Sequence, residues 1–281
     1  MNNLKITGLY IYPVKSMRGI AVDKAQLTHK GLLHDRHWMV VAENGRFITQ
    51  RDIPRMALVN TRLTEQGVEL SMQGNDSIAV PFDLFRGEQI ETSVWRVKCQ
   101  ALDQGEYISD WLTQALGSKK RLRLVRMNPD FVRPQNRPEI MGEKTTTDFA
   151  DGAPLMVANQ ASLDELNTVL ESNSSQAVPM NRFRPNIVVQ GLEPFAEHKL
   201  AGLGAENIEL RFRAPCERCI ITTVDQETAE KDPQEQPFKT LQTINPIPAK
   251  AKAPAFGQYA TLSRGEAEYI VVGDHFEPIV V

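Results

Sequence analysis

Two of the three cysteines in this 281-residue chain lie close together, at Cys216 and Cys219, with Arg218 between them. A thiolate is a soft metal ligand and a nucleophile, and a neighbouring cation favours its formation. A structural zinc site needs about four nitrogen or sulfur ligands, yet Cys99 and the five histidines add no second paired spacing. A redox dithiol is expected at the start of a helix, whereas β-branched residues follow Cys219. Two alternatives remain: packed residues at a strand edge, or a single thiolate on a metal that a cofactor otherwise holds.

Basic and short polar side chains recur where predicted strands begin or end, which is the second chemical signal. Lys15 and Ser16 follow the first predicted strand, whereas Arg36 and Arg184 each precede a later one. Arginine forms paired hydrogen bonds with phosphate, and lysine contributes a point charge. Loops on a rigid β scaffold are also where binding residues concentrate. A solvated surface role is the alternative for each residue alone, but their shared position predicts a site for an anionic cofactor.

Two further side chains admit a structural and a functional interpretation. Asp151, followed by Gly152 and Ala153, is either a turn former or a polar group facing the metal. Tyr259 is either a core aromatic or a phenol that reaches the cofactor. The chain has no Gly-x-Gly-x-x-Gly and no Walker-type loop, which disfavours a nucleotide cofactor.

The elements that would position these residues are mostly strands in the first hundred residues. The Asn44-Gly45 pair and the segment Glu65-Gln66-Gly67 predict two hairpins. One alternating strand is expected from Thr92 to Leu102. Apolar residues at helical spacing then predict a helix from Tyr107 to Leu116, ended by Gly117.

The second half mixes strands with a helix and two long loops. A basic stretch over 118–148 predicts a short strand at 121–125 and then a loop between domains. Ser162 and Glu165 have the spacing of a capping box, which predicts a helix from about 163 to 171. The segment 226–255 is expected to be a second long loop. Strands are predicted at 154–158, 186–190, 208–212, 220–224, 259–262 and 269–272. The whole pattern indicates a β-rich α+β protein with two domains, 1–125 and 126–281.

Composition restricts the class of protein further. The net charge of −3 argues against general binding to a nucleic-acid polymer. No apolar run is long enough to cross a membrane, and the N-terminus lacks the layout of a signal peptide. An odd number of cysteines suits a reducing compartment. We therefore expect a cytoplasmic globular protein without membrane contact.

Several short motifs, taken together and in order, resemble those of one family, the MOSC-domain proteins. The similarity is to the bacterial YcbX-type branch, which is related to the mitochondrial amidoxime-reducing component, and it spans nearly the whole chain. The motifs are Tyr12-Pro13-Val14-Lys15-Ser16, Asp35-Arg36, Ala150-Asp151-Gly152, Phe183-Arg184-Pro185-Asn186, Cys216-x-Arg218-Cys219 with Thr222-Thr223-Val224, and Phe256-Gly257-Gln258.

The resemblance implies a MOSC N-terminal β-barrel domain followed by a MOSC β-barrel domain with a few helices. It also implies a molybdenum centre on a pyranopterin cofactor, with the Cys219 thiolate as the ligand to molybdenum. The implied chemistry is the reduction of N-hydroxylated compounds such as hydroxylamines, amidoximes and N-hydroxylated bases. By motif, the residues implied at the cofactor are Lys15, Ser16, Arg36, Asp151, Gly152, Ala153, Arg184, Glu217 and Tyr259, with Asp151 also a candidate for catalysis.

Two departures from the family pattern affect these expectations. Relatives of the YcbX type commonly carry a C-terminal [2Fe–2S] domain, whereas this chain has no such cysteine cluster before Val281. Either the sequence is a truncated one or the electrons come from a separate protein. We therefore expect no iron–sulfur cluster in this chain and, in the second case, an electron donor of the ferredoxin or flavin reductase type. Glu217 stands where close relatives usually have serine, so its contact with the cofactor is in question.

Two other functions remain open at this point. The protein could carry the molybdenum cofactor or sulfur without turnover, with a persulfide on Cys219, as terminal MOSC domains of cofactor sulfurases suggest. Alternatively, the basic stretch 119–137 could dock an iron–sulfur partner, although a solvated loop explains the same charges.

Overall fold

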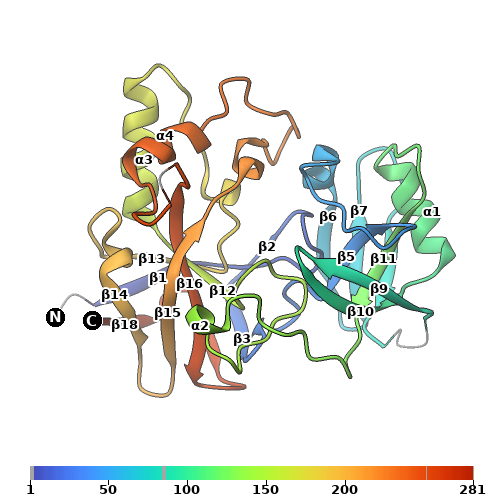
Figure 1. Ribbon diagram of the computed structural model, residues 1–281, viewed down its shortest axis with the longest axis horizontal. Coiled ribbons are helices and arrows are strands. Elements are labelled where there is room, and N and C mark those ends of the chain that lie inside the picture. Colours follow the sequence, from blue (N-terminus) through green and yellow to red (C-terminus); the bar gives the residue numbers. More distant parts are fainter. Residues whose placement is uncertain (1–2, 84–86, 251, 281) are drawn as a thin grey trace.

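The computed structural model describes residues 3–83, 87–250 and 252–280 (Figure 1). Strands dominate it, and the described residues contain four α-helices, so the β-rich class predicted from the sequence is confirmed. Figure 1 shows two bodies side by side: a barrel that includes both chain ends, and a half-barrel built from the first half of the chain.

The larger body is a closed barrel of seven strands, and β1 is the strand that closes it. β1 pairs antiparallel with β13 along one edge and with β18 along the other. The order around the barrel is β13 (Ile187–Gln190), β12 (Leu155–Asn159), β16 (Ala255–Arg264), β15 (Glu209–Glu217), β14 (Leu200–Gly204), β18 (His275–Val280) and β1 (Leu4–Ile11), with β2 (Ile20–Val22) beside β1.

Alternation along β1 explains why the first strand of the chain belongs to this barrel. Leu4 and Ile6 are buried in its core and Lys5 between them is exposed. Because successive strand residues point to opposite faces, one face of β1 completes the apolar interior. The predicted division at 125/126 stays a prediction, and strands from both sides of it share this sheet.

The half-barrel packs around Trp38, which is fully buried with Met56 and Leu112. Its core is closed on one side by helix α1 (Glu106–Ala115). Its two sheets are β5 (Trp38–Ala42), β11 (Leu122–Met127), β10 (Val97–Asp103) and β9 (Gln89–Val94), and then β6 (Asn60–Leu63), β7 (Gly67–Ser71) and β8 (Ile78–Pro81). Apart from the sheets of the barrel and the half-barrel, a separate small sheet consists of β17 (Tyr269–Val271), β3 (Lys24–Thr28) and β4 (Gly31–Leu32).

The remaining helices are short apart from α3, and α3 and α4 lie outside the barrel (Figure 1). They are α2 (Pro138–Met141), α3 (Gln160–Ser172) and α4 (Phe238–Ile244), with 3₁₀ helices η1 (Pro54–Leu58), η2 (Met180–Arg182), η3 (Ala196–Lys199) and η4 (Ile220–Thr223). Among the described residues, no helix is long and apolar enough to cross a membrane.

Several local predictions are confirmed. Strands β6 and β7 form a hairpin across residues 64–66. Helix α1 and strand β11 also lie where the sequence predicted them, and Gly117 follows α1 with a φ of 62°. Local patterning was sufficient here because each segment carries both its periodicity and its turn residue.

Other predictions were wrong. The segment 92–102 is the hairpin β9–β10, because its turn uses Trp95 at a φ of 57° in place of a glycine or asparagine. The segment 220–224 is not a strand, since the hydroxyls of Thr222 and Thr223 donate to backbone carbonyls three residues earlier and favour the 3₁₀ turn η4. The segment expected as a loop over 226–255 contains α4.

Helix α3 begins earlier than its capping box predicted. Its cap is Asn159, whose side-chain oxygen accepts from the Ala161 N–H at 3.2 Å. The hydroxyl of Ser162 instead donates to Glu197, a carboxylate buried beneath the helix. Ser162, which the local pattern predicted to cap the helix, therefore forms a tertiary hydrogen bond with Glu197 and does not serve as the cap.

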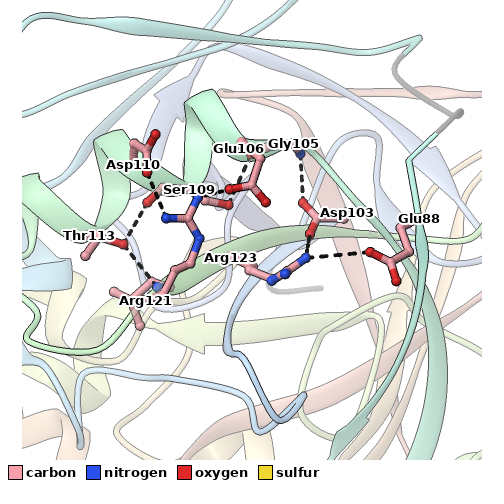
Figure 2. Close-up of polar contacts among 10 residues, drawn as sticks. Glu88, Asp103, Gly105, Glu106, Ser109, Asp110, Thr113, Arg121 and Arg123 are labelled. Atoms are coloured by element: carbon pink, nitrogen blue, oxygen red, sulfur yellow. Dashed lines mark hydrogen bonds and ion pairs between the residues drawn. The ribbon is translucent and has the colours of Figure 1, made fainter.

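Two arginines of the basic stretch that begins near residue 119 are paired with carboxylates. Arg121 contacts Glu106 and Asp110 of α1 (Figure 2). Arg123 contacts Asp103 and lies 3.9 Å from Glu88 in the same view. Four carboxylates thus face two guanidiniums, so these two arginines do not contribute a net positive surface.

Substitution of Gly31 can test the contact between β4 and the start of β12. Its φ is 118°, and a Cβ there would lie 2.4 Å from the backbone carbonyl oxygen of Pro154. Gly74 also has a positive φ, 83°, but nothing lies within 4 Å of its Cβ position. In urea denaturation, we expect Gly31→Ala to lower the free energy of unfolding by about 3 kcal/mol and Gly74→Ala by about 1 kcal/mol. Equal losses would mean that backbone conformation alone, without the clash, sets the cost.

Candidate functional site

A pocket lies where the barrel meets the loop before β12, and all ten site residues predicted from the sequence line it. They are Lys15, Ser16, Arg36, Asp151, Gly152, Ala153, Arg184, Glu217, Cys219 and Tyr259. Its empty space is about 760 Å³ when the part open to solvent is included.

Lys15 is buried at the edge of this pocket and is tied to Asp151. Its ammonium donates to Oδ1 of Asp151 and to the backbone oxygen of Phe149, both at 2.8 Å. Trp95 donates its indole N–H to the same carboxylate oxygen at 2.8 Å. Burial alone would raise the pKa of Asp151, but the charge and hydrogen bond of Lys15 hold that pKa well below its usual range. Asp151 is therefore ionised, and it holds the ammonium group in place.

Arg36 and Arg184 both stack on the ring of Tyr12. Their guanidinium carbons lie 4.4 Å and 4.3 Å from the ring centroid. Arg36 also donates to Asp35 at 2.5 Å and to Asn186 at 3.1 Å. The aromatic face carries negative charge density, so it eases the burial of two like charges. Burial still lowers the pKa of Arg184 to about 10, and that side chain is therefore a cation at neutral pH.

Three of the pocket residues have left-handed backbone conformations. The φ values of Ser16, Arg36 and Arg184 are 67°, 53° and 56°. Such values are uncommon outside glycine and cost about 1 kcal/mol or more each. Strain of this kind concentrates at ligand sites, where the surrounding structure enforces it. Here it places the three side chains along one pocket wall.

Arg184 provides the test of whether an anionic group fits. Its Nη2 is buried and has no hydrogen-bond partner within the described ranges, and its guanidinium forms no ion pair there. A buried cationic donor without a hydrogen-bond partner destabilises the folded protein by several kcal/mol in order of magnitude. An anion such as a phosphate, by accepting that hydrogen bond, would recover this free energy. The residues present therefore fit a phosphorylated cofactor.

The two cysteines differ in what surrounds them. Cys216 is buried, and Arg218 donates to its sulfur at 2.9 Å and to the backbone oxygen of Phe183 at 2.7 Å. Cys219 is exposed at the start of η4, where Arg51 lies 3.7 Å from its sulfur. Only the second thiol is thus available to a bound group, and it is the soft donor that a metal such as molybdenum accepts.

Tyr259 and Glu217 line the pocket together with Cys216. Tyr259 packs against Gly152, where a Cβ would lie 3.2 Å from the ring. Burial raises the pKa of the Tyr259 phenol, which is therefore neutral. The carboxylate of Glu217 accepts a hydrogen bond from the Lys250 ammonium at 2.7 Å. That ion pair offsets the negative charge beside Cys219.

Four side chains at this site, three arginines and one tryptophan, were not among the site residues predicted from the sequence. Arg133 is buried and donates to the carbonyls of Asp148 and Ala150, which fixes the loop that carries Asp151. No local motif indicates this role, nor those of Arg51 and Trp95, because they reach the site from distant segments. Arg218 did have a signal, its place between the two cysteines. Within the part of the chain that is described, no three His, Cys, Asp or Glu residues gather as a metal site.

Comparisons with known proteins agree with this geometry. Residues 3–119 match the family model of the MOSC N-terminal beta barrel domain, and residues 144–277 match that of the MOSC domain. The chain therefore belongs to the MOSC-domain family, as the motifs predicted.

Two kinds of relative are similar over most of this chain. Mitochondrial amidoxime-reducing component 1 of Danio rerio is 34% identical, covering 92% of this chain and 80% of its own length. The human protein of the same name is 32% identical over 96% of this chain and 81% of its own. A molybdenum cofactor sulfurase of Danio rerio is 32% identical over 84% of this chain but 30% of its own.

Thiol accessibility tests the contrast between the cysteines. We expect brief iodoacetamide treatment of the folded protein, prepared without cofactor, to modify Cys219 and to leave Cys216 and Cys99 unmodified, because both of these are buried. Peptide mapping by mass spectrometry measures each thiol, and labelling in urea shows that all three can react. Modification of Cys216 at the rate of Cys219 would contradict the geometry described above.

Proposed function

We propose that this protein is a molybdenum-cofactor-dependent reductase of N-hydroxylated compounds, with Cys219 as the thiolate ligand to molybdenum. The observation that carries the proposal is the exposed thiol of Cys219 in a pocket whose buried Arg184 guanidinium has an unmade hydrogen bond. Homology to amidoxime-reducing components supports the same chemistry. Neither feature is required for the protein to fold.

In this proposal the basic residues hold the pterin and its phosphate. Arg184 and Arg36 present guanidiniums that stack on Tyr12, and Lys15 adds an ammonium that Asp151 orients. The hydroxyl of Ser16 and the backbone near Gly152 and Ala153 complete the set. Asp151 acts by holding Lys15, and Tyr259 bounds the pocket as a neutral phenol.

The bound molybdenum group would supply the two-electron chemistry that removes oxygen from an N–O bond, which no amino-acid side chain can supply. The overall reaction takes up two electrons and two protons and yields an amine or amidine and water. Within this chain, the pocket residues bind and orient, and the open mouth beside Cys219 admits the substrate. We further propose that a separate protein of the ferredoxin or flavin reductase type delivers the electrons, and that both act in the cytoplasm.

Cys219→Ala tests the assignment when the protein is produced with an intact cofactor pathway. We expect molybdenum content to fall about ten-fold or more, because the metal loses its protein ligand, and reduction of benzamidoxime by a dye donor to be lost. Cys99→Ala, in the core of the half-barrel, is the control. Molybdenum content is measured by mass spectrometry. If both the molybdenum content and the turnover are unchanged in Cys219→Ala, the proposal is refuted.

A carrier of cofactor or sulfur is the second candidate, favoured by the similarity to molybdenum cofactor sulfurase. The exposed sulfur of Cys219 could then carry a persulfide. Intact mass spectrometry of the purified protein distinguishes the two functions. A mass increase of one sulfur on Cys219, without turnover of any N-hydroxylated compound, would favour the carrier over the reductase.

A further inference from the structure

The mouth of the pocket beside Cys219 is completed by two side chains of the half-barrel. Arg51 extends to within 3.7 Å of the Cys219 sulfur, and its guanidinium lies over the ring of Trp95 at 4.5 Å. Trp95 in turn donates to Asp151, a residue of the pocket itself. The ring is 46% exposed, although it is one of the largest apolar groups of the chain. Arg51 therefore lies beside the exposed thiol, with the ring of Trp95 packed against its guanidinium.

The backbone that presents Arg51 is held rigidly. The side-chain amides of Gln50 and Gln226 donate to each other at 3.0 Å, and Gln50 also donates to the backbone oxygen of Ser16 at 2.9 Å. Both glutamines are buried. The N–H of Arg51 donates to the hydroxyl of Thr49 at 3.2 Å. Such a segment keeps the guanidinium in one place beside the thiol, which is what preorganised recognition requires.

The turn that presents Trp95 is strained. Its φ of 57° is a genuine outlier for a bulky side chain. Strained conformations persist where the surrounding structure enforces them, and they cluster at active sites and ligand clamps. From this turn the indole N–H reaches Asp151, and the ring lies against the guanidinium of Arg51.

Arg51 brings a positive charge to the entrance and forms no ion pair with a carboxylate of the described residues, although its charge is one of those that lower the pKa of Asp151. Resting on the proposed function, we propose that Arg51, supported by Trp95, selects substrates by charge. It favours neutral and anionic N-hydroxylated compounds and disfavours cationic ones. The same charge assists product release, because a neutral amidoxime becomes an amidine that binds a proton at neutral pH and is then repelled.

Three benzamidoximes whose para positions differ in charge test this inference: para-carboxylate, unsubstituted and para-trimethylammonium. For the wild type at low ionic strength, we expect kcat/KM for the anion to exceed that for the cation about ten-fold, the size of one partly screened charge pair at this range. Added salt should shrink the ratio. Arg51→Gln should bring the ratio close to one, and Arg51→Glu should invert it.

Control variants separate selection by charge from a structural role. Arg62→Gln changes the net charge of the chain equally, but on the outer hairpin of β6 and β7, so the ratio should stay at the wild-type value. Trp95→Leu should reduce the ratio, whereas Trp95→Phe should restore part of it, since a ring still lies behind the guanidinium. A merely structural role would lower kcat/KM for all three compounds alike and leave the ratio unchanged, which would overturn the inference.

A binding measurement distinguishes failure of this inference from failure of the proposed function. Without an electron donor, each compound is titrated against the purified protein, and quenching of Trp95 fluorescence is followed with Trp95→Phe as the signal control. Binding in the expected charge order, lost in Arg51→Gln, supports the inference even if the wild type reduces nothing and the proposed function fails. Turnover of all three compounds at a ratio unchanged in Arg51→Gln refutes the inference alone.

Discussion

The burial of several cations in one pocket is the constraint on which this structure depends. Removing an unpaired cation from water costs far more than any single contact returns. Asp151 offsets the charge of Lys15, and Asp35 offsets that of Arg36. Arg184 has the face of Tyr12 but no carboxylate among the described residues. Burial of Arg184 therefore has a free-energy cost that a bound anion would reduce. The surrounding loops and strands stabilise the fold enough to offset this cost.

Closure of the barrel by β1 is what assembles this group of charges. Because β1 pairs with β13, the residues that follow the one and precede the other lie at the same end of the barrel. Arg36 reaches Asn186 and the backbone oxygen of Arg184 across that junction. Residues from both halves of the sequence thus share a few hydrogen bonds, and the rigid β scaffold holds the site in place.

The part of the site that could be predicted lies in contiguous motifs. Lys15, Arg184 and Cys219 each stand beside a strand boundary and carry unmistakable chemistry, so their types and positions sufficed. Arg51 and Trp95 could not be found, because the turn at Trp95 lacks a glycine or asparagine and the pair meets only through tertiary contacts. Similarly, β-branched residues after Cys219 indicated a strand, and threonine hydroxyls that bond backward produced a 3₁₀ turn instead.

The division of residues between the two bodies suggests why both are retained together. The barrel and its adjoining loops hold Cys219, the arginines on Tyr12 and the loop of Asp151, which are the groups suited to a cofactor. The half-barrel contributes Arg51 and Trp95, which contact the entrance of the pocket and are absent from its walls. Substitution of Arg51 can therefore change what approaches the thiol without removing a contact of the buried cations, whereas Trp95 also donates to Asp151, which holds Lys15. Selectivity and cofactor binding are then separable because two different bodies of the same chain supply them.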